Sequence, residues 1–363
     1  MPTFSDNVLN FSAGPPGFFV LPVSKRKIIG IAETSTGVWT RIDVNGNNLT
    51  GTEYNLNGGY YDSHPVYAGI SHSTIDSQAM GKIPKFYYKY GLGPTGSDQD
   101  GKDCRWISDQ PIDGFSLFPA FMADEVELDH FWAGDYQATN DGGTKAGSVV
   151  STLPLVSRDF PTMQTRCAAR NTGDQTGWQM WDIWQLSAIK LLCLIEMGGS
   201  NSQDIIGSGN VSSSAAVISG STDATWRGFY ELWGNVWQMV DGLQIDGAGQ
   251  IKTWDIVGNH TYVSTGITQA TSGLDGYPVT VFDDSDIDFD LSPIFIGKTI
   301  TGTYASSAFF DYMYGNDPGE ENVCFHGGYW AYGSYAGLFY FHLLSVASNA
   351  YSGVGSRLAK RDL

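Results

Sequence analysis

Charged residues are scarce in this sequence of 363 residues. They make up 16% of the chain, against about 25% in an ordinary soluble domain. Basic residues are the rarer sign, because 20 Lys and Arg stand against 38 Asp and Glu, for a net charge of -18. A chain this acidic repels phosphate backbones and anionic headgroups. We therefore expect no nucleic-acid partner and no binding to an anionic membrane surface.

Cysteine is also scarce, and none of it is arranged as CxxC. The four residues are Cys104, Cys167, Cys193 and Cys324. This wide spacing disfavours a zinc site. Two disulfides are an alternative, but a chain of this length does not need them, so we expect four free or buried thiols.

The sequence has no long apolar run. The most apolar stretch, residues 186–197, is too short to cross a bilayer and contains Lys190 and Glu196, so we expect no membrane insertion. The first 23 residues have no basic region, and their short apolar run is broken by Pro22. We therefore predict that there is no signal peptide, and that any export uses another route.

Catalytic motifs are missing too. The six histidines are scattered without HExxH, and there is neither a Walker loop nor a GxGxxG after a strand. The best metal candidate is FDDSDIDFD, in which Asp284, Asp286 and Asp288 have the spacing of oxygen ligands for calcium. Phe289 stands where an EF-hand loop needs glycine, so a solvated acidic loop is the favoured alternative. We expect no cofactor and no enzymatic activity, with calcium left open.

What the chain does contain is apolar and aromatic residues, with glycine between them. It is 42% hydrophobic and 13% aromatic with 45 glycines, which predicts a globular chain rich in strands and loops. Residues 1–65 are typical of a small, mainly β module, and residues 66–114 of connecting strands. Helical periodicity predicts one long helix over residues 178–197, ended by Gly198 and Gly199.

Four motifs follow one another over about 240 residues. They are FPAFMADEVELDHFWAGDYQATN (118–140), RCAARNTGDQTGWQMWDIWQLSAIKLL (166–192), WRGFYELWGNVWQMVDGL (226–243) and HGGYWAYGSYAGLFYF (326–341), closed by GVGSRLAK (353–360). In this order they resemble the C-type-lectin-like domain of formylglycine-generating-enzyme type, whose GNVWEWV and RGGSW segments they approach. The resemblance implies an α+β fold in which residues 115–363 form one ligand-binding domain behind the small N-terminal β module.

Within that superfamily, the chain is most similar to the variable proteins of diversity-generating retroelements, including bacteriophage receptor-binding proteins. IPKFYYKYG, WISDQPIDGFSLFPAF and GSYAGLFYF carry this resemblance. In such proteins reverse transcription mutates template adenines, so AAY codons become NNY codons, which cannot encode Trp, Met, Lys, Gln or Glu. The resemblance implies a variable region at about residues 326–357.

Residue types reachable from AAY interleave there with a constant frame. The candidate variable, ligand-binding positions are Tyr329, Ala331, Tyr332, Tyr335, His342, Leu344, Ser345, Val346, Ala350, Tyr351, Ser352 and Gly353. The frame is Trp330, Gly333, Ser334, Gly337, Phe339, Val354, Gly355 and Arg357. Tyr, Ser and Gly are the residues of antibody paratopes, which favours a binding face. The alternative is that the same aromatic side chains are core.

The resemblance implies a phage tail receptor-binding protein that recognises a host cell-surface protein or glycan. It would act in the virion or otherwise outside the cell, as a homo-oligomer for which a trimer is the favoured state. One alternative is a calcium-dependent lectin, although the EPN or QPD signature is missing. A less favoured one is a formylglycine-generating-type oxidase, which needs paired reactive cysteines. Cys324 is alone near the C-terminus, and Gln238 replaces the family's Glu.

Overall fold

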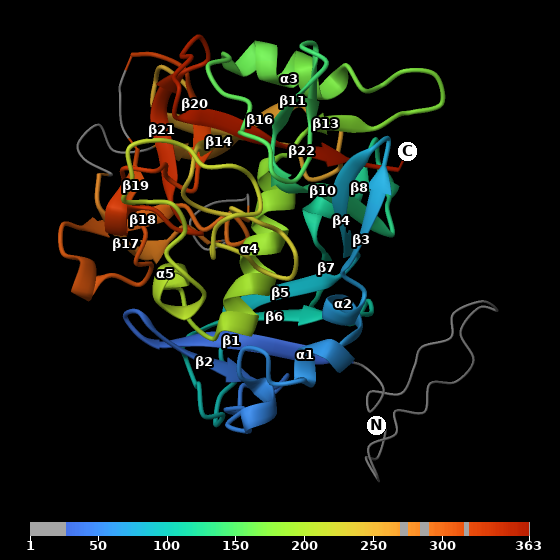
Figure 1. Ribbon diagram of the computed structural model, residues 1–363. Helices are drawn as coiled ribbons and strands as arrows, with labels where there is room; N and C mark the ends of the chain where they lie inside the picture. Colours follow the sequence, from blue (N-terminus) through green and yellow to red (C-terminus); the bar gives the residue numbers. More distant parts are fainter. Residues whose placement is uncertain (1–26, 269–274, 284–289, 316–318, 363) are drawn as a thin grey trace.

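The computed structural model describes residues 27–268, 275–283, 290–315 and 319–362. The described chain is rich in strands, with few helices, and most strands belong to two sheets that lie on either side of one central helix (Figure 1). This confirms the expected mixture of strands and helices. The formylglycine-generating subtype of the fold remains a prediction.

The smaller of these sheets has five strands in the order β2-β1-β6-β5-β7. Its members are β1 (Ile28–Ser35), β2 (Val38–Ile42), β5 (Tyr87–Leu92), β6 (Asp103–Ser108) and β7 (Ser116–Leu117). All neighbours are antiparallel. The turn between β1 and β2 has Gly37 at φ 73°, a conformation that glycine adopts without steric cost.

The larger sheet has eleven strands, and its main path runs β19-β21-β20-β14-β22-β10-β4-β3. Its strands are β3 (Ser71–Ile75), β4 (Gln78–Pro84), β10 (His130–Gln137), β13 (Trp178–Met180), β14 (Trp237–Ile245), β15 (Gln250–Trp254), β16 (Tyr262–Thr268), β19 (Met313–Tyr314), β20 (Asn322–His326), β21 (Phe341–Val346) and β22 (Val354–Lys360). The C-terminal strand β22 lies inside the sheet, parallel to β14 and antiparallel to β10. The end of the chain is therefore a central structural element.

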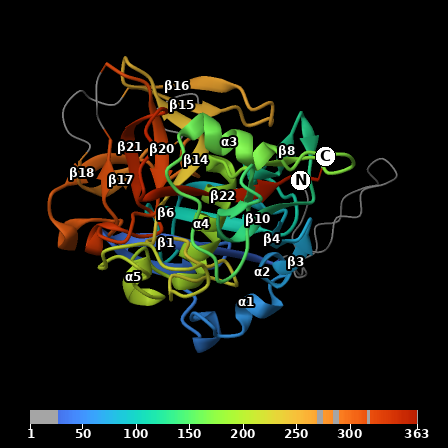
Figure 2. The ribbon, with the colours of Figure 1, turned by 45° about the horizontal axis from the view of Figure 1, so that its top comes forward.

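Shorter elements connect and cover these sheets. They are η2 (Thr52–Tyr54), α1 (Tyr60–Ser63), α2 (Pro65–Ala68), η3 (Pro119–Phe121), β8 (Met122–Ala123), β9 (Val126–Glu127), β11 (Thr139–Asp141), β12 (Lys145–Gly147), α3 (Phe160–Ala168), α5 (Ser202–Ile205), β17 (Tyr277–Val281), β18 (Gly297–Thr301), η4 (Tyr304–Ser306) and η5 (Gly333–Tyr335). Figure 2, turned from the first view, again shows β17 and β18 beside β20 and β21. The polar stretch of residues 200–325 thus contains ordered strands.

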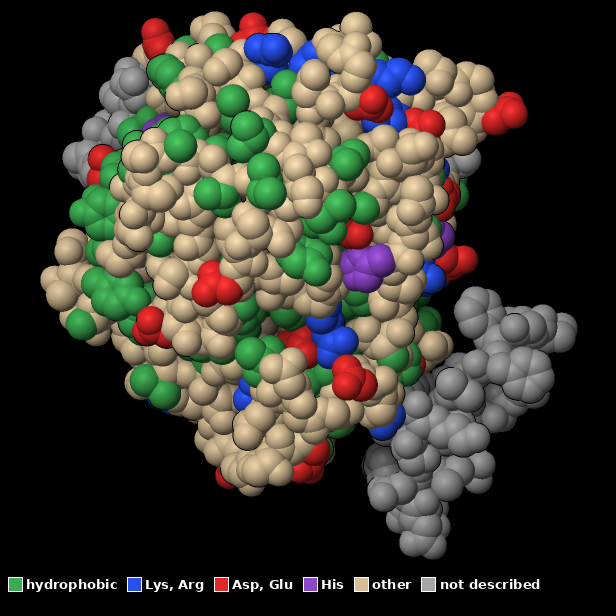
Figure 3. All heavy atoms as spheres, viewed as in Figure 1, with side chains coloured by type: hydrophobic (Ala, Val, Ile, Leu, Met, Phe, Trp, Pro, Cys, Tyr) green, Lys and Arg blue, Asp and Glu red, His purple; other side chains and the backbone are tan. Residues whose placement is uncertain are grey.

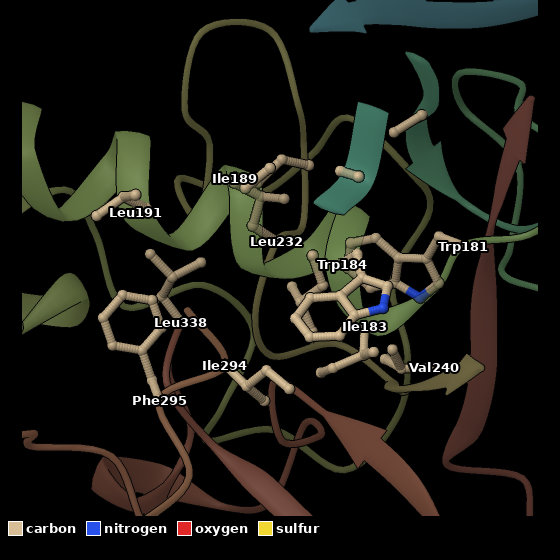
Figure 4. Close-up of a cluster of buried hydrophobic side chains, with 14 of the residues drawn as sticks. Trp181, Ile183, Trp184, Ile189, Leu191, Leu232, Val240, Ile294, Phe295 and Leu338 are labelled. Atoms are coloured by element: carbon tan, nitrogen blue, oxygen red, sulfur yellow. The ribbon is translucent and has the colours of Figure 1, made fainter. Parts of the chain in front are cut away.

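The central helix is α4 (Ile183–Met197), and all of its residues are buried. The predicted helix is confirmed, but it starts five residues later than residue 178. Trp178–Met180 pairs with β22, and Asp182 caps the helix by accepting bonds from the Trp184 and Gln185 N–H groups. Because α4 packs between the sheets, its whole circumference is covered; Figure 4 shows its side chains among Ile294, Phe295 and Leu338.

Backbone pairing crosses both of the expected domain boundaries. Strand β1 pairs with β2 on one side and, on the other, with β6, which belongs to the segment expected as a connector. Strand β4 of the same segment pairs with β10 of the expected C-terminal domain. One hydrophobic cluster extends from Ile29 to Ala359. The division at residues 65 and 114 stays a prediction.

His72, on β3, has an acceptor at each ring nitrogen. Its Nδ1 lies 2.7 Å from Asp135 Oδ1, and its Nε2 lies 2.8 Å from the Arg227 carbonyl oxygen. The hydrogen bond to the Asp135 carboxylate raises the pKa of His72. Only the protonated ring can donate to both partners.

All four cysteines are free and buried, as expected. In the part of the chain that the structure describes, no helix is long and apolar enough to cross a membrane.

Candidate ligand-binding face

The backbone between β20 and β21 is tied to the body of the protein. The Gly333 N–H donates to the Val211 carbonyl at 2.7 Å, and the Ser213 N–H donates to the Trp330 carbonyl at 2.7 Å. The Gln203 amide donates to the carbonyls of Gly333 and Ala336 at 3.0 and 2.6 Å. The loop that displays the candidate positions is therefore held in one conformation.

Strand β21 alternates between buried and half-exposed positions. Phe341, Leu343 and Ser345 are buried, whereas His342, Leu344 and Val346 are half-exposed. Leu344 and Val346 are residue types that could have been core, but neither is fully buried. The pairing with β20 is irregular between Val323 and Phe325, so His342 and Ser345 lie on the same side of the strand, and the Ser345 hydroxyl bonds His342 Nε2 at 3.0 Å.

The other candidate positions lie on the two loops that flank β21. Ala331, Tyr335, Ala350, Tyr351 and Ser352 are exposed, with Tyr335 at 41% and Tyr351 at 50%, while Tyr329 and Tyr332 are half-buried and Gly353 is buried. A Cβ on Gly353 would lie 2.9 Å from the Tyr329 ring. Of the twelve candidate positions, only Ser345 and Gly353 are buried.

The eight frame positions differ in burial, and five of them are buried. Gly337, Phe339, Val354, Gly355 and Arg357 are buried. Gly337 has to be glycine, because a Cβ there would lie 1.9 Å from an Asp311 carboxylate oxygen. Trp330 and Gly333 are half-buried and Ser334 is exposed. Trp330 is therefore a frame residue that is not fully buried, and its ring lies against Tyr329 with ring centroids 5.1 Å apart.

Arg357, on strand β22, is fully buried, and its guanidinium is hydrogen-bonded to neighbouring segments. Its Nε donates to Gln238 Oε1 at 3.0 Å and its Nη1 to the Gly134 carbonyl at 2.7 Å. Its Nη2 donates to the carbonyls of Tyr230 and Glu231 at 2.6 and 2.9 Å. Burial lowers the pKa of Arg357 to about 10, which still leaves it charged at neutral pH. Gln238 therefore helps to hold β22 in place.

Half-buried rings from four parts of the chain meet at the loop. We define the aromatic face as Trp237, Tyr304, Tyr312, Tyr314, Tyr329, Trp330, Tyr332 and Tyr335, with the buried Tyr277 and Tyr340 beneath it. Trp237 stacks on Tyr329 at 4.4 Å between ring centroids and meets Tyr332 edge-on at 4.9 Å. Tyr312 packs on Tyr335 at 4.6 Å. The contacts join candidate variable residues to residues far away in sequence.

Sequence reasoning missed the half of this face that lies outside residues 326–357. Trp237 begins β14, and Tyr312 and Tyr314 flank Met313 in β19. The alternation of aromatic residues in FFDYMYG (309–315) is the one signal that could have pointed to them. Their place in the face depends on β19 pairing with β21, a contact between distant segments.

The face is uncharged. Tyr332 forms hydrogen bonds with the hydroxyls of Tyr314 and Tyr340, and burial raises the pKa of all three phenols. Burial lowers the pKa of the neighbouring His342 to about 4, so this imidazole is neutral at neutral pH. In front of β19, β21 and α5, Figure 3 shows hydrophobic and other uncharged side chains with few charged ones. Such a surface suits an apolar contact.

Features that would support the alternative functions are weak. Cys324 is buried on β20, and burial raises the pKa of its thiol to about 12, the opposite of a reactive thiolate. Asp284, Asp286 and Asp288 lie outside the described residues. Within residues 27–268, 275–283, 290–315 and 319–362, no group of three His, Cys, Asp or Glu side chains could hold a metal ion.

No protein-family model matches the chain. No curated protein matches its sequence either. Among solved structures, it is similar to PvdO from Pseudomonas aeruginosa, with 11% identity over 80% of this chain and 97% of that one and a TM-score of 0.37. It is also similar to Treponema denticola variable protein 1, with 12% identity over 81% of this chain and 99% of that one and a TM-score of 0.35. The Major Tropism Determinant U1 variant follows, with 9% identity over 91% of this chain and 82% of that one and a TM-score of 0.30. At these values the likenesses are too distant to carry a function over to this chain.

Proposed function

We propose that this chain is a ligand-binding variable protein whose C-terminal segment is diversified by a retroelement. The observation that carries the proposal is the division of side chains in residues 326–357. Ten of the twelve candidate variable positions are exposed or half-exposed, while the frame residues Gly337, Phe339, Val354, Gly355 and Arg357 are buried. A segment built this way can change its outward side chains without disturbing its core.

The fixed backbone supports binding as well as diversification. Loop 327–340 is held by hydrogen bonds from Gln203 and to Val211, so an incoming ligand meets side chains that are already in place. Preorganisation lowers the entropy lost on binding. Exposed tyrosines add large contact area at low rotamer cost. The segment therefore combines replaceable contacts with a rigid support.

The finer parts of the proposal follow from the sequence resemblance. The domain has a C-type-lectin-like fold of formylglycine-generating type, and it is not an enzyme. The protein serves as a phage tail receptor-binding protein in the virion, where it binds a host cell-surface protein or glycan. It is a homo-oligomer, for which we propose a trimer, because repeated weak sites gain avidity when they act together.

The test is to sequence the DNA around the gene. We expect a reverse transcriptase gene nearby, and a second, near-identical copy of the 3′ coding end that has adenines wherever the two copies differ. The differences should fall in the codons of the candidate variable positions, such as Tyr335 and Tyr351. They should spare Trp330, which NNY codons cannot encode. A single 3′ end without a second copy, or differences spread evenly over frame codons, would overturn the proposal.

A further inference from the structure

We propose that the ligand site continues beyond the variable segment onto a constant aromatic patch, and that both halves bind one polypeptide surface. The constant aromatic patch is Trp237, Tyr304, Phe310, Tyr312 and Tyr314, all half-buried. The partner presents aliphatic or aromatic side chains at its centre and basic residues around them. This inference rests on the proposed function, because it assumes that Tyr335 and its neighbours face a ligand.

Ring contacts make the two halves one surface. Tyr312 lies between the candidate variable residue Tyr335, at 4.6 Å between ring centroids, and the buried Tyr277, at 5.1 Å. Tyr277 in turn meets Tyr304 at 5.4 Å, and Tyr304 meets Phe310 at 5.1 Å. A ligand that covers Tyr335 therefore has Tyr312 beside it.

The backbone fixes the position of the patch relative to the variable segment. The Tyr312 N–H donates to the Tyr335 carbonyl at 3.0 Å, and the Phe341 N–H donates to the Tyr312 carbonyl at 3.3 Å. Between them, the buried Asp311 carboxylate accepts a bond from the Phe339 N–H at 2.7 Å. These bonds join residues 311–312 to residues 335–341, so the patch and the variable segment are held as one unit.

The patch lies outside the segment that diversification would reach. Trp237 and residues 304–314 precede residue 326, so every diversified copy of the protein would keep them. The variable half can then select among partners, while the constant half supplies contact area common to all of them. Tyrosine and tryptophan are the residue types that most often dominate interface energies.

The chemistry of the patch favours a polypeptide over a sugar. The hydroxyls of Tyr314 and Tyr332 bond to each other, the Tyr304 hydroxyl accepts a bond from the Asn201 amide at 2.7 Å, and Trp237 Nε1 donates to Tyr340 at 3.1 Å. These polar groups are used within the protein, so the patch presents mainly ring carbon. A sugar needs many partners for its hydroxyls, whereas apolar side chains need none.

The rim of the patch is acidic. Asp204 is exposed near Tyr304, because the Asn201 amide donates at 2.7 Å to both the Asp204 carboxylate and the Tyr304 hydroxyl. Asp275 is exposed near Tyr312, whose pKa is raised by burial and also by the charge of Asp275. Charge complementarity therefore calls for lysine or arginine around the apolar centre of the partner. The net charge of -18 acts in the same direction.

The experiment selects binders from a displayed library of random dodecapeptides. One selection uses the full chain, and a second uses the full chain carrying Ala331→Ser, Ala350→Asp and Tyr351→Ser. We expect both sets of peptides to share an aromatic or large aliphatic residue flanked by Lys or Arg. Synthetic peptides from each set should bind at least about tenfold more weakly to Tyr312→Ala, as is typical of a hot-spot residue.

Two further variants keep the result interpretable. Tyr304→Ala tests the outer part of the patch if Tyr312→Ala fails to fold, which a thermal melt would reveal. Leu92→Ala is the matched control, because Leu92 is 66% exposed on β5, in the other sheet, and should leave binding unchanged. If Tyr335→Ala weakens binding but both patch variants bind normally, this inference fails while the proposed function stands.

Other outcomes would also overturn the inference. If no peptide is selected and an array of neutral oligosaccharides yields binders that depend on Tyr312, the partner is a glycan. If Tyr312→Ala changes the mass measured by light scattering, the patch joins copies of this chain. If selected peptides bind regardless of Tyr335, Tyr351 and Tyr312 alike, the proposed function itself fails.

Discussion

Replacement of Arg357 is the perturbation whose cost the structure specifies best. Its guanidinium makes four hydrogen bonds at a site with no solvent exposure, to Gln238 and to three backbone carbonyls. Arg357→Ala would leave those acceptors in a cavity. An unpaired buried polar group costs about 1–3 kcal/mol, although such costs do not add simply.

The acceptors do not all lose their only partner. The Glu231 carbonyl also accepts from the Gln238 amide at 3.1 Å, so the main losses are at Gly134, Tyr230 and Gln238 Oε1. We therefore expect Arg357→Ala to lower the free energy of unfolding by about 4 kcal/mol, within the usual range for breaking a buried charge network. Arg357→Lys should cost at least about 2 kcal/mol, because one ammonium cannot reach acceptors arranged around a planar fork.

Urea unfolding of the full chain, followed by tryptophan fluorescence, would measure both variants. Arg158→Ala is the matched control: this half-exposed arginine donates to the carbonyl of its own neighbour Ser157, so its loss should cost less than about 0.5 kcal/mol. If Arg357→Ala proved no more destabilising than Arg158→Ala, the buried hydrogen bonds of Arg357 would not stabilise the frame of the variable segment.

Three more predictions follow from exposure and charge. Tyr335→Ala and Tyr351→Ala should change stability by no more than about 0.5 kcal/mol in thermal melts; a larger loss would show that these rings are core. Trp330→Ala should cost about 1–2 kcal/mol, less than the roughly 3–5 kcal/mol of a fully buried Trp, because the ring is only half-buried. Stability due to the raised pKa of His72 beside Asp135 should be complete below the ordinary pKa of 6.5 and fall as pH rises through the raised value. Urea unfolding at about pH 5.5 and about pH 8.5 should therefore show a loss that His72→Gln reduces; equal losses would contradict this.

Residue type defines the candidate variable positions but does not determine the burial of each side chain. Ser345 passes the codon test as well as His342 does, yet Ser345 is buried in β21 and His342 is half-exposed. Trp330 belongs to the candidate frame, yet the loop leaves its ring only half-buried. Direction depends on strand register and loop path, which composition does not contain.

The constant half of the aromatic face was out of reach for a different reason. Trp237 and Tyr312 are separated by more than seventy residues in sequence, and the aromatic alternation around Tyr312 does not say which distant segment it contacts. They meet the variable loop because β14 and β19 join the same sheet as β21. The helix expected over residues 178–197 was easier to predict, because its periodicity is local. Its first residues, Trp178–Met180, instead form a strand that pairs with β22. Long-range pairing therefore accounts for what the sequence left undetermined.

The most direct test of the central claim measures which positions in residues 329–357 can be substituted without loss of folding. Two libraries of the full chain would be displayed and sorted for folding by protease resistance. One carries NNY codons at the twelve candidate variable positions, and the other carries them at Gly337, Phe339, Val354, Gly355 and Arg357. We predict that most members of the first library fold, with Ser345 and Gly353 the least tolerant positions, and that most members of the second do not. Equal loss of folded protein in both libraries would contradict a replaceable face on a fixed frame.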